Sequence, residues 1–203
     1  MVDDVVALAR ALFSLEFGRA AEAPIVETLI RYGAGALRFA IACDISVLPL
    51  RDGERYRDVS KTLARLGIDV DRWPAPPAGL FVVEERALLL RSRSPMTVAH
   101  EFGHALDCAL GGGVYRSGID PRVRAHYCRA RAFVTPYAAT GIDEYFAESL
   151  RAYVGVNDPS SAWPRATRER LRRIDPHMCE YVAALFAREF STRATSAALT
   201  GGA

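Results

Sequence analysis

Two histidines and a glutamate in residues 97–107 (TVAHEFGHALD) have the spacing of a metal site on a helix. His100 and His104 are four residues apart, so in an α-helix they lie one turn apart on the same face. Imidazoles placed in this way can bind one Zn²⁺ ion at about 2.0–2.1 Å each. Glu101 follows the first histidine, where its carboxylate can take a proton from a water molecule that the metal activates. This HExxH motif therefore predicts zinc-assisted hydrolysis.

The flanks of the motif are apolar, which indicates a buried helix. The apolar positions are Val98, Ala99, Phe102, Ala105 and Leu106. A buried helix that carried His, Glu and His without a metal would leave polar groups to be satisfied in some other way. Gly103 costs ~1 kcal/mol relative to alanine in a helix interior, so we expect either close packing or a close approach of the substrate at this position. We therefore expect one zinc ion per chain.

A catalytic zinc site requires a third protein ligand. The metzincin pattern is excluded, because Asp107 and Leu110 occupy the positions of its glycine and third histidine. The remaining candidates are His126, His177 and an acidic cluster of Asp143, Glu144 and Glu148. The segment around the acidic cluster is largely apolar, and Glu144 and Glu148 are one helical turn apart. Two like charges at that spacing repel each other unless a cation lies nearby, which favours a carboxylate from this cluster.

The elements that must position these residues follow an α+β order, with strands before most helices. Upstream, we expect an amphipathic helix over 3–18, one long or two short strands over 37–50, and a short helix over 56–66 that ends at Gly67. A proline-rich connector over 73–79 leads into an antiparallel hairpin of 80–84 and 87–91. Downstream, we expect helices over 95–110, 120–131, 142–155, 165–173 and 177–190, and a frayed tail over 191–203.

Composition restricts the class of protein. A chain of 203 residues that is 50% hydrophobic and 25% charged suits one globular domain, and a net charge of +2 gives no support for nucleic-acid binding. No apolar stretch approaches the ~18 residues that span a bilayer, and Asp3 and Asp4 stand where a signal peptide would be cationic. We expect a cytoplasmic monomer without a membrane partner, with export by a non-standard route as the alternative. Four scattered cysteines favour buried thiols over disulfides: Cys43, Cys108, Cys128 and Cys179.

The motif and the acidic segment together resemble a known family. HEFGHALD, followed by Tyr137, AATGID, Glu144 and YFAESLRAY, is similar to the protease domain of anthrax lethal factor and its bacterial relatives. The proline-proline endopeptidases of the same superfamily share this arrangement. The resemblance covers about 79–190 and implies a zincin-like metalloprotease of the gluzincin type. It implies one domain over 1–190, with a helix-and-antiparallel-sheet lobe over about 1–110, a helical lobe over about 111–190, and the active-site cleft between them.

The resemblance also implies roles for single residues. It implies three zinc ligands and a general base: His100, His104, Glu144 and Glu101. Tyr137, seven residues before Glu144, matches the tyrosine that stabilises the oxyanion. Glu148 matches the glutamate one turn after the third ligand, and we expect it to hold a histidine N–H. The chain is too short for the toxin's receptor-binding domains, so the toxin's substrate is not implied.

From these residues we expect a zinc endopeptidase whose peptide substrate adds as an extended strand along 79–84. A cytoplasmic protease that cleaves a repressor would share the helix but not the spacing of Tyr137 and Glu144. A non-catalytic zinc-stabilised binding module would need the ligands but neither Glu101 nor Tyr137. A DNA-associated protein would use the arginines of 165–173, although such a run is more typical of a solvated helix face. The sequence does not indicate which peptide is cleaved, or whether it contains two prolines.

Overall fold

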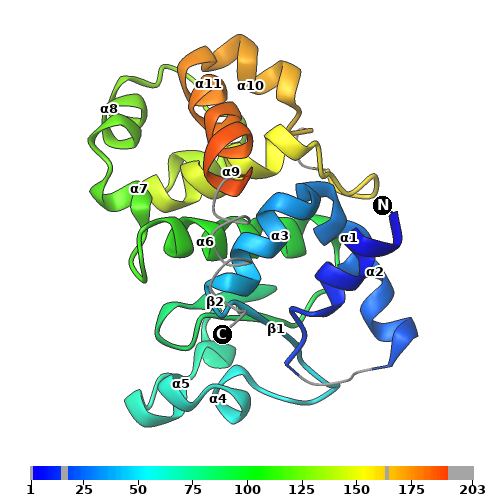
Figure 1. The fold of residues 1–203 in the computed structure, drawn as a ribbon. Coiled ribbons are helices and arrows are strands. Elements are labelled where there is room, and N and C mark those ends of the chain that lie inside the picture. Colours follow the sequence, from blue (N-terminus) through cyan, green and yellow to red (C-terminus); the bar gives the residue numbers. More distant parts are fainter. Residues whose placement is uncertain (1, 15–17, 163–164, 192–203) are drawn as a thin grey trace.

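One small sheet lies in a mostly helical chain in the computed structural model, which describes residues 2–14, 18–162 and 165–191 (Figure 1). Within these residues the sheet has the order β1–β3–β2, with β1 at Ser46–Pro49, β2 at Gly79–Val82 and β3 at Ala87–Leu90. Strands β2 and β3 are antiparallel, as the predicted hairpin requires, whereas β1 is parallel to β3. The fold is therefore α+β, but the sheet is mixed and not purely antiparallel.

In the part of the chain that the structure describes, three α-helices precede β1, where the sequence predicts one helix and strands. They are α1 (Val2–Arg10), α2 (Arg19–Leu29) and α3 (Gly33–Ala42). The predicted helix over 3–18 is too long, because α1 ends at Arg10. Residues 15–17 of that prediction lie outside the described residues. The start of α2 carries no sequence signal, because its N-cap Gly18 has no side chain to cap the helix and Pro24 lies inside it.

The strand prediction over 37–50 is wrong in its first half, which is the helix α3. Its buried residues fall at helical spacing: Ala36, Leu37, Phe39 and Ala40. They pack toward α1 and toward the HExxH helix α6 (Pro95–Leu110). The segment is apolar on nearly all sides, so its periodicity suits a strand or a helix equally, and its packing partners decide between them. The strand is confined to β1.

Two short helices replace the one expected over 56–66. They are α4 (Tyr56–Val59) and α5 (Lys61–Leu66), and Gly67 closes α5 with a φ of +67°, as its predicted role requires. The chain breaks at Ser60, whose side chain caps α5 by accepting a hydrogen bond from the Leu63 N–H at 3.1 Å. The connector over 73–78 contains neither helix nor strand and leads directly into β2. The connector thereby places β2, an edge strand of the sheet, beside the HExxH helix α6.

Helix α6 has the predicted bounds and lies between the sheet and the C-terminal helices (Figure 1). Ser94 caps it by accepting a hydrogen bond from the Thr97 N–H at 3.2 Å, and Pro95 takes the first helical position, where no N–H is needed. Its residues from Val98 to Leu110 are buried apart from His100. It packs on β2 and β3, on α2 and α3, and on α9 (Ile142–Val154).

The helices beyond α6 follow the predicted order. They are α7 (Arg116–Ile119), α8 (Pro121–Arg129), α9, α10 (Arg168–Ile174) and α11 (Pro176–Ala184), which continues as a π-helical turn over Leu185–Glu189. The short α7 is not predicted, and the expected tail lies outside the described residues from 192 onward. Cys108 and Cys179 are buried as expected, but Cys128 is exposed and Cys43 is partly buried, and none of the four forms a disulfide within the described residues. The division into two lobes stays a prediction.

Gly103 allows α6 and α9 to touch. A Cβ atom at Gly103 would meet the Ala147 Cα at 2.9 Å and the Ala147 carbonyl oxygen at 3.1 Å, closer than ordinary van der Waals contact. The cost of a glycine inside a helix is therefore offset by close approach of the two backbones, which is the packing alternative of the two that the sequence left open.

Replacing Gly103 with alanine is expected to destabilise the protein by ~1–3 kcal/mol, because the new methyl group overpacks the contact. The Gly118→Ala variant in α7 is the matched control, since a Cβ there would meet nothing within 4 Å. Denaturant unfolding of both variants measures the difference. Equal stability of the two variants would show that the helices do not meet at Gly103.

Candidate metal centre

Three side chains from two helices converge on one point. His100 and His104 project from α6, and Glu144 projects from the first turn of α9. Glu144 Oε2 lies 2.9 Å from His100 Nε2 and 3.3 Å from His104 Nε2, and the two Nε2 atoms are 3.0 Å apart. Neighbouring ligands of a tetrahedral zinc ion at 2.0–2.1 Å would be about 3.3 Å apart. Among the described residues, this is the group of three with suitably placed ligand atoms.

The three converging atoms suit a zinc ion, because they direct more lone pairs at one point than the protons on these groups can satisfy. Glu148 Oε1 lies 3.0 Å from His100 Nδ1, and an ionised carboxylate only accepts hydrogen bonds. It therefore keeps the proton of His100 on Nδ1 and leaves Nε2 as a lone pair. Glu144 Oε2 is buried without a hydrogen bond of acceptable geometry. A cation among the three atoms would satisfy the bare lone pairs.

The charges around this point favour a positive ion. Burial alone would lower the pKa of His100, but the adjacent carboxylates of Glu144 and Glu148 raise it to about 10. Burial alone would raise the pKa of Glu144, but the adjacent imidazoles of His100 and His104 lower it to about 2. The residues around this point therefore favour a positive charge, which a bound proton or a metal ion can supply.

Glu101 lies beside this point without belonging to the group. Its side chain is buried against the first residue of the edge strand, since a Cβ at Gly79 would meet the Glu101 Cγ at 2.6 Å. Burial raises the pKa of Glu101, although the nearby His100 and His104 act to lower it. A carboxylate with a raised pKa accepts a proton more readily than an ordinary carboxylate does.

Tyr137 lies at the open side of the site, in the 3₁₀ turn Tyr137–Ala139 (η4), and is 43% exposed. Its ring centroid is 5.2 Å from that of His100, and its hydroxyl donates a hydrogen bond to Glu144 Oε1 at 3.2 Å. Burial and the charge of Glu144 raise the pKa of Tyr137 above its usual range. The phenol therefore keeps its proton and remains a hydrogen-bond donor.

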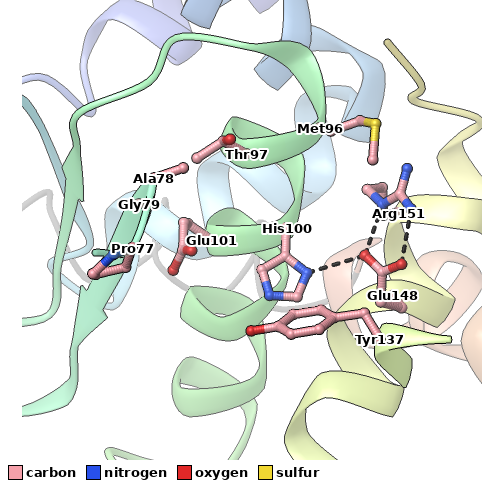
Figure 2. A pocket seen from close by; sticks show the side chains of 10 residues that line it. All are labelled: Pro77, Ala78, Gly79, Met96, Thr97, His100, Glu101, Tyr137, Glu148 and Arg151. Carbon is pink, nitrogen blue, oxygen red and sulfur yellow. Dashed lines mark hydrogen bonds and ion pairs between the residues drawn. The ribbon is translucent and has the colours of Figure 1, made fainter. Parts of the chain in front are cut away.

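Glu148 lies behind His100 and not in the group of three (Figure 2). Arg151 binds its carboxylate through two hydrogen bonds of 2.8 Å. Burial would raise the pKa of Glu148, but Arg151 and His100 hold it well below its usual range. Arg151 is not among the residues predicted from the sequence, although an arginine three residues after a glutamate in an apolar helix is a signal for such a pair.

The other candidate ligands lie outside the group. His126 and His177 face each other instead, with ring centroids 5.9 Å apart. They line a separate hollow with Arg129 and Arg131. Asp143 also takes no part, so of the candidate third ligands only Glu144 joins the two histidines of α6.

A cavity of about 330 Å³ adjoins the site. Figure 2 shows Gly79 and Glu101 on one side of His100 and Arg151 on the other, while the ring of Tyr137 lies beneath His100 with its hydroxyl toward the Glu101 side. The cavity therefore joins the edge strand β2 to the two side chains for which we predict catalytic roles. It is large enough to receive a substrate side chain.

Comparison with known proteins supports the fold. No family model matches the chain, and no curated protein matches it by sequence. Among solved structures, the Pro-Pro endopeptidase PPEP-2 from Paenibacillus alvei is similar with a TM-score of 0.61 and 20% sequence identity, over 88% of this chain and 99% of that chain. The likeness to lethal factor stays a prediction. The chain therefore has the fold of a Pro-Pro endopeptidase, and it has that fold over most of its length and not only over 79–190.

Proposed function

We propose that this protein is a zinc-dependent endopeptidase. One observation carries the proposal: the Nε2 atoms of His100 and His104 and a carboxylate oxygen of Glu144 converge beside the buried Glu101 and the hydroxyl of Tyr137. A binding module that used zinc only for stability would need the first three residues and neither of the others. The endopeptidase fold of the structural neighbour supports the same conclusion.

In the proposed mechanism, the metal ligands, Glu101 and Tyr137 each have a different role. A zinc ion held by His100, His104 and Glu144 would act as a Lewis acid and would lower the pKa of a water molecule. Glu101 accepts a proton from this water and passes it to the leaving amine, as general acid–base catalysis requires. The Tyr137 hydroxyl donates a hydrogen bond to the substrate carbonyl oxygen as negative charge develops there.

The peptide would bind along β2. This strand pairs with β3 on one side and, in the described part of the chain, has no partner strand on the other. An extended peptide can pair with the free backbone groups of such an edge. Because Gly79 touches Glu101, a peptide on this edge would pass directly beside the proposed general base.

Partners and location stay predictions. In the ranges that the structure describes, no helix is both long and apolar enough to cross a membrane. The arginines of α10 are largely exposed, as a solvated helix face would have them. We keep the prediction of a monomer that binds peptides and no nucleic acid.

The first test concerns the metal. Elemental analysis of the purified chain should give one zinc per chain, and His100→Ala or Glu144→Ala should lose most of it, because each removes a ligand. Glu148→Gln should keep the metal with an affinity about 10–100-fold lower, because it weakens only the support of His100. If Glu148→Gln loses the zinc while Glu144→Ala retains it, the two glutamates have exchanged roles.

The second test separates catalysis from metal binding. In a cleavage screen with a peptide library that includes Pro-Pro sequences, Glu101→Gln should keep zinc and lose about 10²–10⁴-fold in kcat. Tyr137→Phe should lose about 10²–10³-fold, since it removes one oxyanion donor. Tyr153→Phe is the control, because Tyr153 stacks on Phe186 and lies outside the site. Unchanged turnover in the Glu101 variant would refute the mechanism.

A further inference from the structure

Four polar contacts converge on the buried carboxylate of Glu148. Its Oε1 faces His100 Nδ1 at 3.0 Å and accepts from Arg151 Nε at 2.8 Å. Its Oε2 accepts from Arg151 Nη2 at 2.8 Å and from Thr135 Oγ1 at 2.5 Å. A carboxylate offers about four lone-pair sites, so these partners use them all. Because Glu148 is 3% and Thr135 is 1% exposed, water does not replace a lost partner without a rearrangement.

Arg151 limits the movement of this carboxylate. Its guanidinium is 1% exposed and binds both Glu148 oxygens in a fork. On the opposite side, its Nη1 donates to the Val156 carbonyl oxygen at 2.9 Å. An arginine held on both sides in this way presents the carboxylate in one orientation.

Thr135 connects the carboxylate to the turn that carries Tyr137. A hydroxyl has one proton, and that of Thr135 is donated to Glu148. Its lone pairs are left to accept a hydrogen bond from the Ala138 N–H at 3.2 Å. Ala138 follows Tyr137 in the 3₁₀ turn η4. Glu148 therefore reaches His100 directly and the Tyr137 turn through Thr135.

Of the side-chain hydrogen bonds to the backbone of this turn in the described residues, the one to Thr135 is buried. The Tyr127 hydroxyl donates to the Ala139 carbonyl oxygen at 3.1 Å, and the Thr140 hydroxyl donates to the Tyr137 carbonyl oxygen at 2.7 Å, but both of these bonds are exposed. Exposed hydrogen bonds exchange readily with water and hold a turn weakly, whereas a buried bond is costly to leave unmade. The Thr135 bond is therefore the side-chain hydrogen bond that is most costly to lose at this turn, and it acts beside the packing of the buried Ala138 side chain.

We propose that Thr135 is a positioning residue that places the Tyr137 hydroxyl through the chain Glu148–Thr135–Ala138. The Glu148 carboxylate thereby sets two groups at once, the imidazole of His100 and the phenol of Tyr137. The catalytic consequence rests on the proposed function, because it assigns Tyr137 to the substrate carbonyl. The link between Thr135 and the turn does not depend on that assignment.

The first experiment measures the link without activity. Thr135→Val keeps the shape of the side chain and removes both hydrogen bonds, whereas Thr135→Ser keeps the hydroxyl. In the full chain, amide hydrogen exchange over 136–140 should accelerate about fivefold in Thr135→Val, as expected for one lost hydrogen bond, and stay unchanged in Thr135→Ser. Thr28→Val is the matched control, because Thr28 is also buried but its hydroxyl bonds to Pro24 within α2. If Thr135→Val fails to fold, Thr135→Ala against Thr135→Ser makes the same comparison.

The second experiment measures the catalytic consequence by a double-mutant cycle. Thr135→Val should lower kcat about tenfold at unchanged zinc content, and should lower it little further in the Tyr137→Phe background, because the phenol that it positions is already absent. Thr135→Ser should restore kcat. Multiplicative losses in the double variant, or unchanged exchange over 136–140 in Thr135→Val, would overturn the proposal. If the unmodified zinc-loaded chain cleaves no peptide, the proposed function fails, and the exchange experiment alone decides whether Thr135 holds the turn.

Discussion

The site depends on the close contact between α6 and α9. Gly103 lies in the helical turn between His100 and His104, and its counterpart Ala147 lies in the turn between Glu144 and Glu148. The two helices therefore touch at the centre of four functional side chains. Any change in their separation changes the distances between the predicted zinc ligands directly. Small residues at this point determine the geometry of the site, although they take no part in its chemistry.

Charge is the second constraint. Three buried or partly buried carboxylates gather here, from Glu101, Glu144 and Glu148, and the charge of Arg151 is paired with only one of them, Glu148. Burying a charge is costly unless an opposite charge compensates it. The raised pKa of His100 and the lowered pKa of Glu144 both indicate that a positive charge is favoured at this point. A metal ion would meet that need, and Arg151 keeps the carboxylate behind it ionised.

Local signals were sufficient for part of this arrangement. The spacing of His100 and His104 and the cap at Ser94 predict α6, and the glycine at 103 predicts either close packing or a close approach of the substrate. Signals that depend on distant partners were not readable: the segment from 37 onward is apolar enough for a strand or a helix, and packing makes its first half α3. Thr135 was missed for the same reason, because nothing near it in the sequence indicates a bond to a carboxylate thirteen residues away.

The central claim is that one zinc ion binds His100, His104 and Glu144 together. X-ray absorption at the zinc edge tests it most directly, because it reports the atoms around the metal. The account predicts only nitrogen and oxygen neighbours at about 2.0–2.1 Å, with the outer-shell scattering of two imidazole rings. A sulfur neighbour at about 2.3 Å, which would place zinc on a cysteine, or a spectrum without imidazole scattering would contradict it.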